Sequence, residues 1–425
     1  MIFNKKQTKN LGYLYVVQVV NQIFPVITIP ILIAGLGLNE YGVLQFALSF
    51  SGYVYLIADY GFALSAPRDI ARNRDNVNYI SRLYYIVQTT RLLMLVSCYV
   101  LVGLFFVLTD VFSLYETVCL YMILYTCGNI LFPVWYFQGM EDLRYSASLT
   151  LVTKASQFIC IYYSLRNNSD IMVIVAIYCC LNCLQAIIAH IVILKKYKLI
   201  FYRPKISDIK DAIRSGWVLF VSQSATSLFS SANILILGAV ATPAAVAIFA
   251  TGEKIVRAAV NFIGPISRVI YPSSCRLFPK SYKVGLEYIK SIAKYVVPLF
   301  AMGSIMLFAL SEFIAIIFTK EYYTEVALII KILAPLPLFI MVNNLAGTQI
   351  ILNVNAEKTL KNIVVSTGIL NIIIAFILAQ ELGAVGMATS SLVAELYMML
   401  ATLVFAKIKG DKYEKTQNIS CNVHL

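Results

Sequence analysis

Long apolar stretches recur along the whole chain, and short polar segments separate them. A helix needs about 20 apolar residues to cross the ~30 Å hydrocarbon core of a bilayer, and these stretches reach that length. The pattern therefore predicts an all-α membrane protein. We expect twelve transmembrane helices, at residues 12–36, 40–64, 80–108, 112–137, 146–165, 170–194, 213–240, 244–271, 289–310, 326–352, 360–380 and 383–406.

Basic residues in the connecting segments are distributed unevenly between the two sides of the predicted membrane. One side carries 24 of the 34 Lys and Arg residues, and the other carries Arg166 and Lys320 alone. Cytoplasmic loops are the ones enriched in Lys and Arg, so we expect both termini in the cytoplasm. This topology also accounts for the net charge of +13, and we expect no nucleic-acid partner.

The longest cytoplasmic connection, 195–212, is basic and divides the chain into related halves. At an offset of 203, positions 31–47 match 234–250 at seven of seventeen residues, without a gap. Transporters built from two such halves bind substrate near the bilayer midplane between them. We predict an N-terminal six-helix bundle at 1–194, a linker at 195–212, a C-terminal six-helix bundle at 213–406 and a cytoplasmic tail at 407–425.

Four bases fall deep inside predicted spans, where an unpaired charge is costly and usually functional. Lys254 lies ~15 Å into the span that starts at Ala244, at ~1.5 Å per residue. Arg257 shares its helix face, whereas Glu253 points about 100° away from Lys254, and we expect this acid to neutralise the bases poorly. The alternative interpretation is a local ion pair. The predicted substrate-binding residues are Arg91, Lys154, Lys254 and Arg257.

Polar residues also recur at helical spacing in several spans, for example Ser222, Thr226, Ser230 and Asn233 in the seventh. Such stripes either join helices through hydrogen bonds or line a wetted cavity. The amides on the leading helix of each half favour a cavity.

Enzyme and metal chemistry find little support in the sequence. The nine cysteines show no metal-ligand spacing, and the two histidines, His190 and His424, lack ligand partners. No P-loop pattern indicates ATP use. We therefore expect neither catalytic residues nor a metal or cofactor, and energy from H⁺ or Na⁺ antiport. The acids that could couple to such an ion are Asp59, Glu253 and Glu395, although Asp59 could instead pair with a base.

Four ordered stretches resemble the Wzx-type O-antigen flippases, the polysaccharide branch of the multidrug/oligosaccharidyl-lipid/polysaccharide exporter superfamily. The first comprises Phe24-Pro25-Val26-Ile27-Thr28-Ile29-Pro30 and Gly35-Leu36-Gly37-Leu38-Asn39-Glu40-Tyr41-Gly42. The second comprises Asp59-Tyr60-Gly61-Phe62 and Ala66-Pro67-Arg68-Asp69-Ile70-Ala71. The third is Pro133-Val134-Trp135-Tyr136-Phe137-Gln138-Gly139-Met140-Glu141, and the fourth runs from Asn233 through Glu253-Lys254 to Tyr271-Pro272.

The resemblance implies a V-shaped pair of six-helix bundles around a cationic cavity, in the bacterial inner membrane. It also implies alternating access and transport of an undecaprenyl-pyrophosphate-linked oligosaccharide from cytoplasm to periplasm. In that setting the four deep bases would neutralise the pyrophosphate, and arginine can pair with phosphate oxygens bidentately. The implied partners are membrane lipids, a polysaccharide polymerase and a chain-length regulator.

Two other functions remain open. A multidrug or cation antiporter of the same superfamily should have an anionic or aromatic cavity, whereas the deep charges here are mostly basic. A membrane polysaccharide polymerase should have a large periplasmic loop with catalytic bases. The predicted outer loops do not exceed about 15 residues, which is short for that purpose.

Overall fold

The computed structural model describes the backbone of residues 5–109 and 112–423, and their side chains except those of 5–18, 218–219, 221–231 and 415–423. This part of the chain contains helices and turns and no strand. The prediction of an all-α fold is thus confirmed for the described residues. The contacts divide the chain into an N-terminal unit, Met1–Leu228, and a C-terminal unit, Phe229–Leu425.

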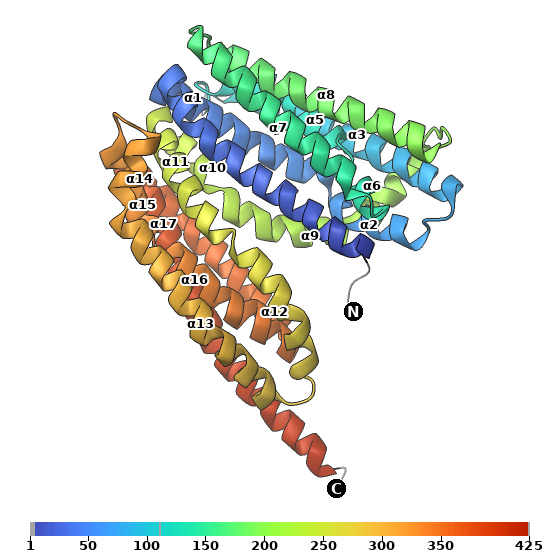
Figure 1. Ribbon diagram of the computed structural model, residues 1–425, viewed down its shortest axis with the longest axis vertical. Coiled ribbons are helices and arrows are strands. Elements are labelled where there is room, and N and C mark those ends of the chain that lie inside the picture. The colour runs from blue at the N-terminus through green and yellow to red at the C-terminus, as the bar shows by residue number, and fades with distance from the viewer. Residues whose placement is uncertain (1–4, 110–111, 424–425) are drawn as a thin grey trace. The chain divides into compact units, whose positions relative to one another are not determined.

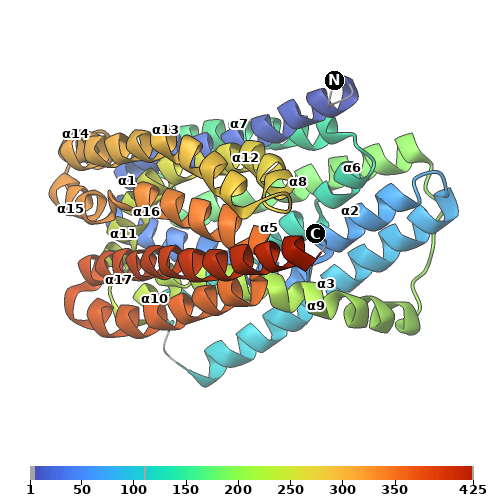
Figure 2. The same cartoon turned by 90° about the horizontal axis from the view of Figure 1, so that it is seen from below.

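The N-terminal unit holds the first helices of the chain (Figures 1 and 2). Helix α7 packs against both α1 and α8, and α2 packs against α6. A buried aromatic cluster around Tyr84, Trp135 and Tyr136 ties α3, α6 and α8 together. The helices are α1 (Lys5–Asp59), α2 (Phe62–Arg72), α3 (Val77–Leu108), α4 (Glu116–Tyr121), α5 (Ile123–Leu131), α6 (Val134–Gly139), α7 (Leu143–Arg166), α8 (Ile171–Tyr197) and α9 (Ile206–Ser231).

The C-terminal unit has its core around Phe278, Met341 and Ile351, where α12, α13, α16, η1 and α17 meet. A π-helix, η1, continues α16. The helices are α10 (Asn233–Val240), α11 (Pro243–Val260), α12 (Ile263–Leu277), α13 (Tyr282–Ala309), α14 (Ser311–Phe318), α15 (Tyr323–Leu333), α16 (Leu336–Asn343), η1 (Asn344–Ile351), η2 (Leu352–Val354) and α17 (Glu357–Val423).

Two of the helices contain a sharp break at a glycine. The backbone of Gly37 in α1 has φ 79°, and that of Gly383 in α17 has φ 54°. Only glycine adopts such angles readily, because it has no Cβ. Gly37 falls between the first two predicted spans, and Gly383 is the first residue of the last one, so each break lies close to a predicted boundary between two crossings.

Many large apolar side chains point outward, which is the reverse of a soluble protein. Leu101 and Leu104 on α3 and Ile305 on α13 are all more than half exposed. Seven helical stretches are long and apolar enough to cross a membrane: Val19–Asp59, Val77–Leu108, Glu116–Gly139, Ile171–Tyr197, Tyr282–Ala309, Tyr323–Val354 and Glu357–Glu414. The chain is therefore a multi-pass membrane protein. The count of twelve crossings stays a prediction.

The division between the units differs in position from the predicted linker, 195–212. The linker region ends as the first turn of α9, and the division falls inside α9, after Leu228. The beginning of α9 belongs to the N-terminal unit because Phe220 stacks on Tyr60, with ring centroids 4.6 Å apart. The division into two halves of six spans stays a prediction.

The predicted helix from Ala244 to Tyr271 is interrupted, and this expectation was wrong. Helix α11 ends at Val260, and α12 begins at Ile263. The cause is Pro265, which has no N–H to donate to the carbonyl of Asn261 and whose ring clashes with that carbonyl. The break falls just after the charged turn of α11.

Candidate functional site

Asp59 and Arg91 form a buried ion pair in the N-terminal unit. Asp59 is the last residue of α1, and Arg91 lies in the middle of α3. Their Oδ1 and Nη2 atoms are 2.8 Å apart, and the side chains are 4% and 1% exposed. The other carboxylate oxygen of Asp59 accepts a hydrogen bond from the backbone N–H of Ala63, at 3.1 Å, in the first turn of α2.

This pair joins three helices, and its two charges neutralise each other within the unit. The expectation that Asp59 could pair with a base instead of coupling to an ion agrees with this geometry. The sequence reasoning placed Arg91 in a substrate site, whereas the structure buries its guanidinium against Asp59. Neither residue is therefore part of the substrate site proposed below.

Lys154 has a different environment, although it belongs to the same unit. It lies near the middle of α7, and its Nζ donates a hydrogen bond to Oε1 of Gln157 at 3.1 Å. The structure does not bring Lys154 into an ion pair with any acid that it describes. Gln157 itself is 3% exposed.

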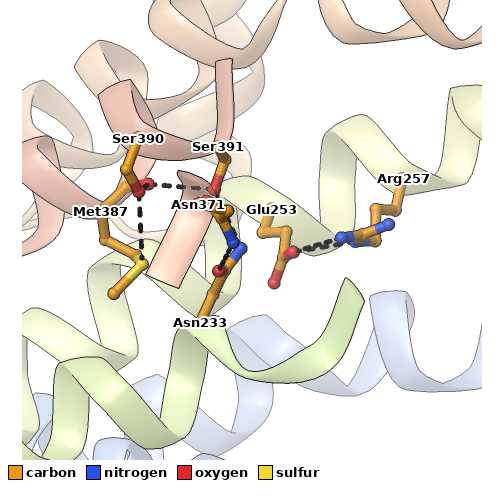
Figure 3. Close-up of polar contacts among 7 residues, drawn as sticks. All are labelled: Asn233, Glu253, Arg257, Asn371, Met387, Ser390 and Ser391. Atoms are coloured by element: carbon orange, nitrogen blue, oxygen red, sulfur yellow. Dashed lines mark hydrogen bonds and ion pairs between the residues drawn. The ribbon is translucent and has the colours of Figure 1, made fainter. Parts of the chain in front are cut away.

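Glu253 and Arg257 form the second deep ion pair, on α11 of the C-terminal unit. Oε1 of Glu253 lies 2.8 Å from both Nε and Nη2 of Arg257 (Figure 3). The expectation that Glu253 would neutralise the bases poorly was wrong for Arg257. That expectation considered the neighbouring Lys254, whereas residues four apart lie on one helix face. The Arg257 side chain is still 42% exposed, and that of Glu253 is 12% exposed.

A neutral hydrogen-bond network lies in the same unit as this pair. The amide of Asn371 donates to Oδ1 of Asn233 at 2.8 Å, and the amide of Asn233 donates to the hydroxyl of Ser391 at 2.9 Å (Figure 3). The network joins α10 to the two segments of α17 that lie before and after Gly383. Asn233 was part of a predicted polar stripe, but the side chains of the other members, Ser222, Thr226 and Ser230, lie outside the described residues.

Sequence reasoning missed Asn371 and Ser391, because an isolated polar residue in an apolar helix gives no periodic signal. Glu395 lies one turn beyond Ser391 on α17 and close enough to Arg257 to interact with it electrostatically. Its Oε2 is buried and has no hydrogen-bond partner among the described residues. Gln349, in the tenth predicted span, joins two helices: its amide donates to the hydroxyl of Ser267 and accepts from that of Ser274, both on α12.

The site in the C-terminal unit thus combines two acids, Glu253 and Glu395, with two bases, Lys254 and Arg257. When all four are ionised, their charges cancel. An anion can bind to Arg257 if it displaces Glu253, or if one of the acids takes up a cation or proton. The convergence of this site and Lys154 on one cavity stays a prediction.

The helices that carry these residues are not among the most apolar of the chain. Neither α7, with Lys154, nor α11, with Glu253, Lys254 and Arg257, is among the seven stretches that qualify as membrane spans by length and hydropathy. A helix that crosses a membrane with charged residues in its middle needs to face the protein interior or water on that side. The composition of α7 and α11 therefore favours a position beside a polar interior.

Comparisons with known proteins agree with this description. The chain matches the family described as "Polysaccharide biosynthesis protein" over residues 7–278. It is 23% identical to an Escherichia coli (strain K12) protein named "Putative O-antigen transporter", over 94% of this chain and 96% of that protein.

Two solved structures share the fold. The lipid II flippase MurJ, in an inward closed conformation, has a TM-score of 0.72 and 12% identity, covering 97% of this chain and 92% of that one. An inward-facing multidrug resistance MATE transporter of the MOP superfamily has a TM-score of 0.71 and 12% identity, covering 96% and 99%. The family match and the Escherichia coli relative confirm the resemblance to O-antigen transporters, and the two solved structures show a shared fold.

Proposed function

We propose that this chain, which belongs to the polysaccharide biosynthesis protein family, is a flippase for lipid-linked oligosaccharides and not an enzyme. Its substrate is an undecaprenyl-pyrophosphate-linked O-antigen or similar repeat unit, moved from the cytoplasmic to the periplasmic leaflet by alternating access. The name of the Escherichia coli relative and the fold shared with a lipid II flippase support this proposal.

The proposed topology has twelve crossings in two six-helix bundles, in the bacterial inner membrane, with both termini in the cytoplasm. Its support is the excess of Lys and Arg on one side of the predicted spans. In the cell, a polysaccharide polymerase and a chain-length regulator are the proposed partners, because they act on the exported repeat units.

The head group binds at Arg257 and Lys254 in the C-terminal unit and at Lys154 in the N-terminal unit. One observation carries this assignment. The guanidinium of Arg257 is in the middle of the chain's deep charged stretch, yet its side chain is 42% exposed beside Glu253. A pyrophosphate that enters hydrocarbon without a counter-charge meets a prohibitive desolvation cost, and arginine offers paired donors to phosphate oxygens. The lipid tail stays in the bilayer while the head group crosses.

Coupling to H⁺ or Na⁺ takes place at Glu253 or Glu395. Either acid lies near Arg257, so neutralising it with a cation leaves Arg257 available to the phosphate. Ionisation of the acid then restores the internal pair and favours release. This exchange makes the charge state of the acids and the occupancy of the site depend on each other.

The test is deletion of the protein followed by lipid analysis. We expect single undecaprenyl-linked repeat units to accumulate on the cytoplasmic leaflet. Arg257→Ala and Lys254→Ala should abolish surface polysaccharide while protein remains in the membrane, and Arg68→Ala, at an exposed position, is the control. Near-normal export by both variants would refute the assignment of these residues.

The same experiment separates the alternatives. Accumulation of single units on the periplasmic leaflet would indicate a polymerase. The fold shared with a MATE transporter favours a multidrug antiporter as the second candidate. Drug sensitivity of the deletion strain with unchanged polysaccharide would support that candidate.

A further inference from the structure

Lys154 is too deep in its helix to reach the membrane surface. Helix α7 extends from Leu143 to Arg166, and Lys154 is eleven and twelve residues from these ends. At ~1.5 Å per residue the distance along the axis is about 17 Å in either direction. A lysine side chain extends its amine toward water only over the last turn or two of a helix. The ammonium group of Lys154 therefore needs a partner at this depth.

No acid that the structure describes in the N-terminal unit forms an ion pair with Lys154. Asp59 is occupied by Arg91, and Asp142 by Arg144 and Lys196. Among the described residues, the polar contact of the Lys154 ammonium is the side-chain oxygen of Gln157. An amide oxygen accepts one hydrogen bond but does not cancel the charge, and two N–H groups of the ammonium remain.

Gln157 adds a second unsatisfied donor at the same place. Its Oε1 faces Lys154, so its Nε2 points away with two N–H groups. Nε2 is buried and has no hydrogen-bond partner among the residues that the structure describes, and the whole residue is 3% exposed. Leaving a buried donor unpaired costs about 1–3 kcal/mol. Such a cost in the resting protein is understandable if a ligand accepts these hydrogen bonds during transport.

The remaining N–H groups of Lys154 and Gln157 form a cluster of donors that carries one positive charge. Its complement is a group with several acceptor oxygens and negative charge, which is a phosphate or a carboxylate. Phosphate fits better, because its oxygens point in several directions and accept from both donors together.

We propose that Lys154 and Gln157 together form an oxyanion site in the N-terminal unit that binds a phosphate of the lipid-linked head group. Lys154 supplies the charge, and Gln157 both orients Lys154 through Oε1 and donates to the phosphate from Nε2. This inference rests on the proposed function for the identity of the anion. It adds Gln157 as a specificity-determining residue.

The test uses the purified full-length protein and farnesyl pyrophosphate as the probe, with titration calorimetry. Gln157→Glu keeps the size of the side chain but offers Lys154 a carboxylate, which occupies the ammonium and repels the anion. We expect it to weaken probe binding at least tenfold without lowering the melting temperature. Lys154→Gln should weaken binding as strongly, and Gln157→Met, which lacks the donor, should weaken it severalfold. Gln138→Glu, the same change at an exposed position, is the control.

A carboxylate probe, glucuronate, separates the two sources of an anion. A loss confined to farnesyl pyrophosphate supports the phosphate site. A loss confined to glucuronate would instead assign the pair to an acidic sugar and overturn the proposal. Probe binding by Gln157→Glu and Gln157→Met within twofold of wild type, or no probe binding by wild type, would also overturn it.

These outcomes are distinct from failure of the proposed function. If deletion of the protein left surface polysaccharide unchanged, the flippase function would fail whatever the probe binds. If deletion blocked export while Gln157→Glu kept full affinity and export, only the Lys154–Gln157 site would fail.

Discussion

The two deep ion pairs have the same contact distance and opposite surroundings. Asp59 and Arg91 approach to 2.8 Å, as do Glu253 and Arg257. The first pair joins α1 to α3, with α2 bonded to Asp59, and is almost fully buried. The second lies within one turn of α11, with the Arg257 side chain 42% exposed. A charge held between helices fixes their positions, whereas a charge held within one helix can exchange its partner without moving the backbone.

The largest expected effect comes from breaking the buried pair. Asp59→Asn leaves Arg91 buried without a counter-charge and should cost about 3–5 kcal/mol. The melting temperature in detergent and the amount of protein in the membrane measure this loss. Asp59→Asn combined with Arg91→Leu should recover much of the stability, because no isolated charge remains. A single variant that melts within a degree of wild type would refute the structural role of this pair.

Glu253→Gln tests whether the partly exposed pair contributes little to stability and competes with the substrate. It should change stability by no more than about 1 kcal/mol, because an ion pair within one helix whose arginine is partly exposed contributes little. Without its competitor, Arg257 should bind farnesyl pyrophosphate severalfold more tightly, and export should slow because release is hindered. Titration of the probe and surface polysaccharide measure the two effects. Weaker probe binding would contradict a competition between Glu253 and the phosphate.

Breaking a neutral hydrogen bond between helices should reduce stability far less than breaking the buried ion pair. Asn371→Leu removes the hydrogen bond to Asn233 and should cost about 0.6 kcal/mol and at most about 1.7 kcal/mol, the average and the maximum measured for such bonds in a membrane protein. Thr367→Val, one turn earlier on α17, is the matched control, because within the described part of the chain the Thr367 hydroxyl bonds to the carbonyl of Ile363 in its own helix. Equal melting temperatures of the two variants would show that the Asn371–Asn233 bond adds nothing.

The smallest effect is expected outside the membrane, at Arg82 and Asp208. Hydrogen bonds from Tyr202, the backbone of Lys205 and Arg82 lower the pKa of Asp208 from 3.8 to about 2. A lowered pKa of an acid stabilises the fold above the unfolded value and loses this effect as pH falls through the folded value. The difference in melting temperature between wild type and Asp208→Asn should therefore be constant above about pH 5 and shrink below about pH 4. A difference that widened in acid would contradict this assignment.

Much of the architecture follows from local sequence, whereas the pairing of the deep charges does not. The length and hydropathy of the apolar stretches indicate membrane helices, and the ordered motifs indicate the superfamily. Asp59 and Arg91 lie on different helices, and Asn233 and Asn371 are 138 positions apart, so no local pattern predicts these contacts. The Glu253–Arg257 contact was within reach, because the residues are four apart. It was missed because the direction of Glu253 was compared only with that of the adjacent Lys254.

The break that Pro265 imposes has an electrostatic consequence. Because α11 stops at Val260, its last carbonyl groups end inside the predicted membrane span and point past Arg257. The peptide dipoles of a helix add up to about half a negative charge at its C-terminus. Arg257 lies in this last turn, so the dipole favours its positive charge, although its guanidinium reaches back to Glu253. A cation in this turn stays partly stabilised while its carboxylate partner is away, which is what a phosphate-exchanging site needs.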